Sequence, residues 1–318
     1  MVKIFFTCYW QENFLEVIKK NTPNNSGIWK NIYATNDIYD CDYIIVLDDL
    51  DKNLLQKGEN HFKNTIRESQ IIFFQRENTA FIKQRHKSWF ITNILPYVNK
   101  KYTHENKFFY TFTTANFLNK TYDELKNMKC PKKSKHISCI VSTKNINSNY
   151  AKRIQFIKNY SDKYPNSIDI FGKGWNTNLG NNFKGELGNY HRHDKNKNHS
   201  KLDGLYYYNY SICLENFPNE IGYTSEKITD VLLSWCMPIY WGSKYTNKYY
   251  PNDAFHLIDL DEENILLKVH NISETPITQK NIEAIKIARD LILDKYNIWE
   301  HIYQIILNQK NYENNYSF

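Results

Sequence analysis

The feature of this sequence that most constrains its fold is a recurring short apolar run that ends in charged or polar residues. A parallel strand buried on both faces forms such a run, and its carboxyl end emerges at the sheet edge where α/β proteins bind ligands. Helix-compatible segments separate the runs, so the chain alternates β and α units. The runs are "VKIFFTCYW" (2–10), "CDYIIVLDD" (41–49), "SQIIFFQREN" (69–78), "HISCIVST" (136–143), "SIDIFGKGW" (167–175), "YYYNYSICLEN" (206–216), "PIYWGS" (238–243) and "AFHLIDL" (254–260).

The length and one lysine-rich segment indicate two domains. A chain of 318 residues is too long for one small core, and 41% hydrophobic and 16% aromatic residues are enough to build real cores. Pro131 and many lysines mark the boundary between the two sets of strands. We expect a Rossmann-like domain over 1–125, a linker over 126–136, a second Rossmann-like domain over 137–300, and a helix and tail over 301–318, with a cleft between the domains.

The formal charge of +7 favours anionic partners such as a phosphorylated small molecule, a membrane surface or nucleic acid. The densest basic cluster, "KNMKCPKKSKH" (126–136), is not interleaved with aromatic residues, so we interpret it as an exposed linker and expect no nucleic-acid binding. Six cysteines without a CxxC pair indicate free thiols in a reducing compartment. No run approaches the roughly 20 apolar residues of a membrane span, and the N-terminus turns polar too early for a signal peptide, so we expect a soluble cytoplasmic protein.

The segment "ENFPNEIGYTSEKITDVLLSWCMPIYWG" (215–242) carries the strongest functional signal. A helix is predicted from near Thr224, with its apolar stripe packed on the sheet. Thr224 or Ser225 can cap this helix with a hydroxyl group, and Gly222 allows a tight turn just before it. The stripe consists of Ile228, Val231, Leu232 and Trp235.

Lys227 is unusual in this helix because a cation in the first turn opposes the helix dipole. A bound phosphate would reverse that penalty, since a helix N-terminus attracts anions. Glu226 beside it suits the dipole and could accept hydrogen bonds from a ribose. The alternative is an ordinary surface Glu–Lys pair. The preceding loop favours a ligand site because it is dense in hydrogen-bonding groups, namely Glu215, Asn216, Asn219, Glu220 and Tyr223.

The stretch from "YSICLEN" to "PIYWGS" resembles the donor-binding motif of the family 10 glycosyltransferases, the α-1,3/4-fucosyltransferases. That motif runs from a "FEN" strand end through "Y-x-T/S-E-K-I/L" to "P-I/V-Y/V-x-G". The chain departs from it by having two hydroxyl residues before Glu-Lys instead of one. The resemblance implies an α/β GT-B fold, with two Rossmann-like domains facing across a cleft. It places the acceptor mainly in the N-terminal domain and GDP-fucose mainly in the C-terminal domain.

The resemblance also implies roles for residues of this segment. Lys227 corresponds to the lysine that contacts the diphosphate, and Glu226 to the acid that contacts the ribose. Asn216 and Tyr223 match further donor-site positions. Thr224 and Ser225 occupy the capping positions and could offer N–H or hydroxyl groups to a phosphate.

Two residues outside the segment match family positions. "CIVSTKNINSNYAKRIQF" fits a strand, a variable stretch and a helix that begins with an arginine, which assigns Arg153 as a clamp for the leaving diphosphate. The alternative for Arg153 is a helix-surface arginine. "IIFFQRENTAF" resembles a bacterial "GEN" site, which assigns Glu77 as the general base. Arg76 either holds that carboxylate or is solvated.

The implied reaction is inverting transfer of L-fucose from GDP-β-L-fucose to a hydroxyl of an N-acetylglucosamine-containing glycan, with an α-1,3 linkage as the family default. The resemblance implies a role in protein glycosylation or in the synthesis of Lewis antigens. Because cations and the helix N-terminus can stabilise departing GDP, no metal or other cofactor is required. The chain lacks the family's leucine-rich heptads, so a monomer or weak dimer is expected.

The sequence leaves other functions open. The chain could be a GT-B transferase for another nucleotide sugar, or a non-catalytic glycan- or nucleotide-binding protein. Three Asp-x-Asp spacings, at 40/42, 49/51 and 259/261, are weak signals for a metal-dependent transferase. "HRHDKNKNH", with His191, His193 and His199, is interpreted as a loop and not as a metal site.

Overall fold

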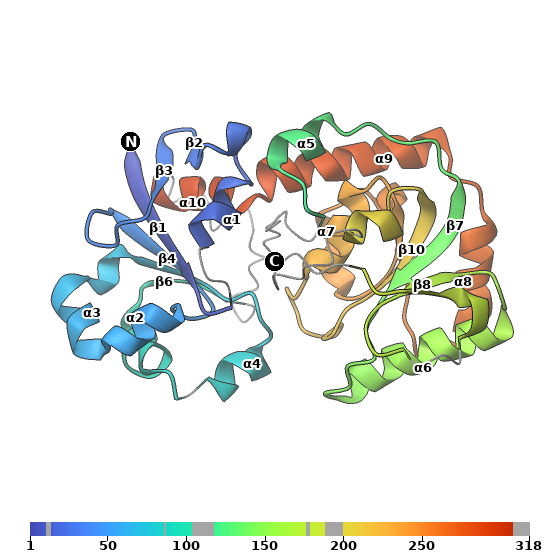
Figure 1. Ribbon diagram of the computed structural model, residues 1–318, viewed down its shortest axis with the longest axis horizontal. Coiled ribbons are helices and arrows are strands. Elements are labelled where there is room, and N and C mark those ends of the chain that lie inside the picture. Colours follow the sequence, from blue (N-terminus) through green and yellow to red (C-terminus); the bar gives the residue numbers. More distant parts are fainter. Residues whose placement is uncertain (11–13, 86, 104–117, 176–178, 188–199, 308–318) are drawn as a thin grey trace.

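The computed structural model describes residues 1–10, 14–85, 87–103, 118–175, 179–187 and 200–307. Two α/β units lie side by side, each with a central sheet and helices packed around it (Figure 1). The α/β fold class predicted from the sequence is therefore confirmed. The segment "HRHDKNKNH" (191–199), which the sequence analysis interprets as a loop, and residues 308–318 lie outside the described residues.

The N-terminal sheet has the strand order β2-β3-β1-β4-β5-β6, and its strands are parallel except where β2 meets β3. The surrounding helices are α1 (Phe14–Lys19), α2 (Lys52–Lys57), α3 (Glu59–Thr65) and α4 (Thr79–Gln84). The strands are β1 (Val2–Cys8), β2 (Ile28–Trp29), β3 (Ile32–Thr35), β4 (Tyr43–Leu47), β5 (Ile71–Phe74) and β6 (Lys100–Tyr102).

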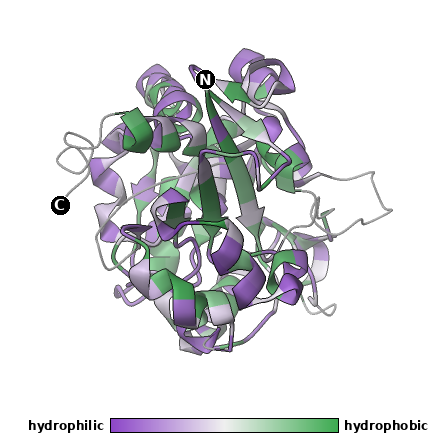
Figure 2. Ribbon diagram, turned by 90° about the vertical axis from the view of Figure 1, so that its left-hand side faces the viewer, coloured by the Kyte–Doolittle hydropathy of each residue, from purple (hydrophilic) through white to green (hydrophobic). Residues whose placement is uncertain are grey.

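The apolar runs are continuous because each central strand buries both of its faces. Ile45 and Leu47 of β4 join one apolar cluster, whereas Ile44 and Val46 of the same strand join the cluster on the opposite face. Successive side chains of a strand point to opposite faces, so a strand covered on both sides needs apolar residues at every position. Figure 2, in which the N-terminal domain faces the viewer, shows the strands mainly in hydrophobic colours.

The C-terminal sheet has the order β12-β11-β10-β7-β8-β9 and is parallel throughout. Its helices are α6 (Ser148–Lys163), α7 (Glu226–Leu233), α8 (Ile265–Glu274) and α9 (Gln279–Asp290). Its strands are β7 (Lys135–Ile140), β8 (Asp169–Phe171), β9 (Phe183–Gly185), β10 (Tyr208–Leu214), β11 (Met237–Trp241) and β12 (His256–Leu257). The six cysteines are free, and four of them are buried.

Two further helices connect the domains. The N–H of Tyr122 in α5 (Tyr122–Asn127) donates to the carbonyl of Lys20 in the first domain, whereas Leu125 is buried in the core of the second. Helix α10 (Ile298–Leu307) returns to the first domain and buries Ile298 and Trp299 in its core. Both residues fall within 137–300, the range predicted for the second domain, so the return to the first domain begins earlier than predicted.

Six of the eleven residues of the lysine-rich segment 126–136 are exposed, as a linker requires, but others are packed against the second domain. The Nζ of Lys133 donates to the carbonyl oxygen of Tyr206 at 2.8 Å, and burial lowers the pKa of this lysine. Arg289 donates to the carbonyl of Met128 and lies 4.4 Å from the ring centroid of Trp235. The helices in the described ranges lack the length and apolar character that a bilayer crossing needs.

Candidate active site

The predicted strand–loop–helix unit lies at the carboxyl edge of the C-terminal sheet. Strand β10 ends at Leu214, and the loop that follows turns at Gly222 with a φ of 78°, a conformation that glycine adopts without steric cost. Ser225 caps α7, since its hydroxyl accepts a hydrogen bond from the backbone N–H of Lys227 at 3.3 Å. The Thr224 hydroxyl is buried and has no hydrogen-bond partner in the described part of the chain.

Helix α7 is shorter than the sequence pattern predicts. It ends at Leu233, and Trp235 has a φ of 57°, which no α-helical residue has. Ile228, Val231 and Leu232 are buried against the sheet as expected. Trp235 lies beyond the end of the helix, but its side chain still packs, partly buried, against the same core, and its indole N–H donates to the carbonyl of Met128.

A fully buried carboxylate, Glu215, organises the start of α7. It accepts hydrogen bonds from the backbone N–H of Ser225 at 2.9 Å, from the Ser225 hydroxyl, and from the Nζ of Lys227 at 3.4 Å. The hydroxyl of Tyr240 donates to it at 3.3 Å. Lys227 therefore has a buried anionic partner in addition to Glu226, and this partner was not predicted from the sequence. An acid directly after a buried strand was the signal that could have found this partner.

Two side chains at the start of α7, those of Glu226 and Lys227, are ionised at neutral pH. Burial alone would raise the pKa of Glu226, but Lys227 and Lys201 lower it to about 2. Burial alone would lower the pKa of Lys227, but Glu215 and Glu226 raise it above its ordinary value. Both side chains are therefore charged. They are partly buried, so their fields are screened less than those of surface charges.

Arg153 points from α6 to the end of β10. Its Nη1 donates to the carbonyl of Leu214 at 3.2 Å and to the Oδ1 of Asn216 at 2.6 Å. Only 3% of the residue is exposed, so the alternative of a helix-surface arginine is wrong. The guanidinium lies 4.4 Å from the ring centroid of Tyr150. Its Nε is buried and has no hydrogen-bond partner within the described ranges.

Three aromatic side chains, those of Tyr150, Phe217 and Tyr223, pack together at the same loop. The Phe217 ring meets the rings of Tyr150 and Tyr223 edge-on, with centroid distances of 6.4 and 5.6 Å. Tyr223 is 4% exposed. The structure therefore brings Asn216, Tyr223, Thr224, Ser225, Glu226, Lys227 and Arg153 together at one sheet edge.

Glu77 lies at the corresponding edge of the N-terminal sheet, just after β5. The Oδ1 of Asp48, a fully buried residue at the end of β4, accepts the backbone N–H groups of Arg76 at 2.6 Å and Glu77 at 2.9 Å. The Oδ2 of Asp48 has no hydrogen-bond partner in the part of the chain that the structure describes. The sequence analysis did not identify this support for the Glu77 loop.

The charges at the start of α7 act on Glu77. Burial raises its pKa, Arg76 lowers it, and the charges of Glu226 and Lys227 in the other domain also act on it. The guanidinium of Arg76 lies 5.2 Å from the ring centroid of Trp10. The carboxyl ends of the two sheets thus meet at the predicted site, with Glu77 on one side and both anions and cations on the other, namely Glu215, Glu226, Lys227 and Arg153.

The acids of the three Asp-x-Asp spacings interact with nearby protein groups. Asp40 and Asp42 bind Lys3, Asp49 pairs with Arg85, and Asp51 caps α2. Asp261 pairs with Lys152, and Asp259 accepts the backbone N–H of Asp261. Among the described residues, no three His, Cys, Asp or Glu side chains are grouped as a metal ion would need.

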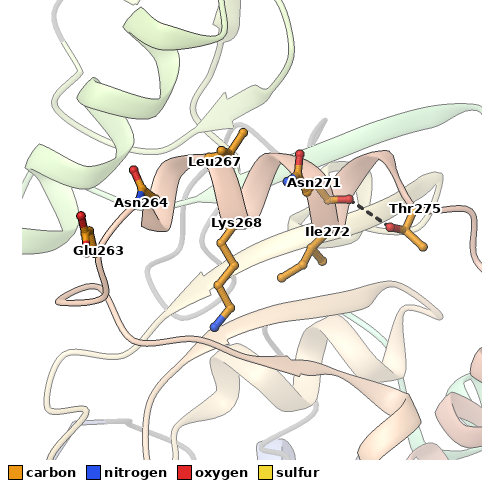
Figure 3. Close-up of a pocket in the computed structure, with 7 residues that line it drawn as sticks. All are labelled: Glu263, Asn264, Leu267, Lys268, Asn271, Ile272 and Thr275. Carbon is orange, nitrogen blue, oxygen red and sulfur yellow. Dashed lines mark hydrogen bonds between the residues drawn. The ribbon is translucent and has the colours of Figure 1, made fainter.

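A separate surface pocket of about 460 Å³ runs along α8 (Figure 3). All of its lining residues come from α8, the two positions before it and the one after it, and none is a predicted site residue. They are Glu263, Asn264, Leu267, Lys268, Asn271, Ile272 and Thr275.

We expect Asp48→Asn to remove a pH-dependent part of the stability. Burial raises the pKa of Asp48 to about 7. The folded state then retains a proton that an unfolded aspartate loses above about pH 4, so this contribution to the free energy of unfolding falls as pH rises towards 7. Urea unfolding at several values between about pH 5 and 8 would show the wild type losing stability relative to the variant as the pH rises towards 7. Parallel curves would contradict the prediction.

Residues 130–269 match the family described as "Glycosyltransferase family 10 (fucosyltransferase) C-term". No curated protein sequence matched the chain.

Three solved structures are similar to the chain. An α1,3-fucosyltransferase with GDP is 16% identical, with 98% of this chain and 90% of that chain covered and a TM-score of 0.43. An α1,3-fucosyltransferase with GDP-fucose is 18% identical, with 92% and 81% covered and a TM-score of 0.36. The DNA-modifying enzyme β-glucosyltransferase is 12% identical, with 96% and 99% covered and a TM-score of 0.50. This last likeness concerns the fold alone, which is GT-B, as the sequence predicted.

Proposed function

We propose that this chain transfers L-fucose from GDP-β-L-fucose. Residues 130–269 match the C-terminal part of the family 10 glycosyltransferases, the fucosyltransferase family, and the chain is a glycosyltransferase. The acceptor is a hydroxyl of an N-acetylglucosamine-containing glycan, and the linkage is α-1,3 with inversion. The observation that carries this proposal is that Arg153, Glu226 and Lys227 gather at one sheet edge, while the partly buried Glu77 lies at the corresponding edge of the other domain, where the charges of Glu226 and Lys227 act on it.

The donor side of the site has hydrogen-bond capacity left for a diphosphate. The Nζ of Lys227 has three N–H bonds, of which Ser225 and Glu215 take two. The Nη1 of Arg153 is held by the end of β10, while Nη2 makes no hydrogen bond to the described residues. The charged Glu226 suits the hydroxyl groups of a ribose. Asn216, Tyr223, Thr224 and Ser225 complete the donor site in this proposal.

The reaction follows from these positions. Glu77 takes the proton of the acceptor hydroxyl, and the oxygen attacks the anomeric carbon of fucose. The bond between that carbon and the β-phosphate oxygen breaks, and the electron pair leaves with GDP. Arg153, Lys227 and the start of α7 stabilise the charge on GDP, which is electrostatic catalysis by groups fixed in advance. The raised pKa of Glu77 makes it a stronger base than an ordinary glutamate. The step needs no metal ion in this proposal.

Calorimetric titration in EDTA tests the donor assignment. We expect GDP and GDP-fucose to bind, and UDP-N-acetylglucosamine to bind much more weakly, because the loop and helix are proposed to select a guanosine diphosphate. GDP-mannose serves as the control for the sugar pocket. Preference for the uridine donor, or binding that returns only with a divalent metal, would contradict the proposal.

A further inference from the structure

The carboxylate of Glu220 joins the two domains next to the candidate base. Its Oε1 accepts a hydrogen bond from the backbone N–H of Thr79 at 2.8 Å and another from the Thr79 hydroxyl at 2.7 Å. Glu220 belongs to the donor loop of the C-terminal domain, and Thr79 begins α4 of the N-terminal domain. Both residues are partly buried, so water competes less for these hydrogen bonds than at an open surface.

On the N-terminal side, the contact acts on the segment that carries Glu77. Thr79 is two residues after Glu77, and the Nε2 of Gln75 donates both to the carbonyl of Glu77 at 3.0 Å and to the Thr79 hydroxyl at 3.3 Å. Asp48 holds the backbone N–H of Glu77 from the opposite direction. Residues 75–79 are thus held from their own sheet by Asp48 and from the other domain by Glu220.

On the C-terminal side, Glu220 lies in a turn between two predicted donor contacts. Its N–H donates to the carbonyl of Phe217 at 3.3 Å, and its own carbonyl accepts the N–H of Tyr223 at 3.2 Å. A ligand that orders Asn216 and Tyr223 therefore also orders Glu220. Helix α4 lies on the side of the N-terminal domain that is turned towards the C-terminal domain (Figure 1).

We propose that Glu220 is a positioning residue, which through Thr79 couples occupation of the donor loop to the placement of Glu77. The inference rests on the proposed function and assigns a role to a residue that has no motif position. Two hydrogen bonds to a carboxylate are strong enough to fix a short loop, because a charged acceptor roughly doubles their strength. Misplacement of a catalytic group by about 1 Å can cost 100-fold in rate.

The kinetic test compares Glu220→Ala with Glu220→Gln and with Glu263→Ala, an exposed acid of the same domain. Glu220→Ala is expected to lower kcat by about 10- to 100-fold while the Kd for GDP changes by less than about threefold. Glu220→Gln should recover most of kcat, because its amide oxygen can accept the same two hydrogen bonds. A fall in GDP affinity that accounts for the whole loss, or a kcat equal to that of Glu263→Ala, would overturn the inference.

Hydrogen exchange separates this inference from the proposed function. In the wild type, GDP should protect both the 215–227 and the 75–84 segments, and in Glu220→Ala only the first. Without nucleotide, the 75–84 segment should exchange faster in Glu220→Ala than in Glu263→Ala, because the Thr79 amide has lost its acceptor. Equal exchange there overturns the role of Glu220. Absence of protection at 215–227 in the wild type counts against the GDP-fucose proposal instead.

Discussion

Replacing Glu77 with glutamine is expected to reduce fucosyl transfer by about 10²- to 10⁴-fold, the usual contribution of a positioned general base. Glutamine has nearly the same size but cannot take a proton from the acceptor hydroxyl. The hydrogen bond from the backbone of residue 77 to Asp48 remains, so the fold and the loop should persist. Transfer is measured as kcat with GDP-fucose and an N-acetylglucosamine-containing acceptor, and GDP binding by calorimetry.

The control for this variant is Glu68→Gln, an exposed glutamate of the same domain, which should leave kcat unchanged. GDP affinity should be preserved in both variants. Because the ionised carboxylate is the active form, wild-type kcat/KM should fall as pH drops through the pKa of Glu77, which lies above its ordinary value. A fully active Glu77→Gln variant would show that another group takes the proton.

Replacing Lys227 with methionine is expected to impair both binding and folding. Loss of a charge-assisted hydrogen bond costs about 1.5–3 kcal/mol, so the Kd for GDP should rise by roughly 10- to 150-fold. The variant also leaves Glu215, which is fully buried, without its cation. Breaking such a buried pair costs about 3–5 kcal/mol of stability, and the hydrogen bonds from Ser225 and Tyr240 offset part of it.

A double variant separates the two effects. Adding Glu215→Gln to Lys227→Met removes the uncompensated charge, so stability in urea unfolding should largely return while GDP affinity stays low. Lys268→Met is the matched control, because Lys268 is an exposed lysine of the same domain that pairs with Glu262 on the surface. Its effect on stability should stay within about 1 kcal/mol. Unchanged GDP affinity in the double variant would remove the diphosphate role proposed for Lys227.

The sequence alone determined the two sheets and the position of the donor loop. Strands such as β4 and β5 are buried on both faces, so their apolar runs are uninterrupted and visible without a structure. Strands β2, β3, β6 and β9 were not predicted, because each has at most four residues and no such run. The capping serine and the Glu–Lys pair of α7 are neighbours in the chain, so they could be predicted from a short stretch of sequence.

The tertiary structure alone decided how the site is supported. Lys227 is neutralised by Glu215 from 12 positions away, and the Glu77 loop is held by Asp48 from 29 positions away. Glu220 reaches Thr79 across 141 positions and between two domains. Such partners are set by how strand ends meet when the sheets are packed together, and no short sequence pattern records that arrangement. The charge state of each site residue depends on the same packing, because burial and neighbouring charges determine its pKa.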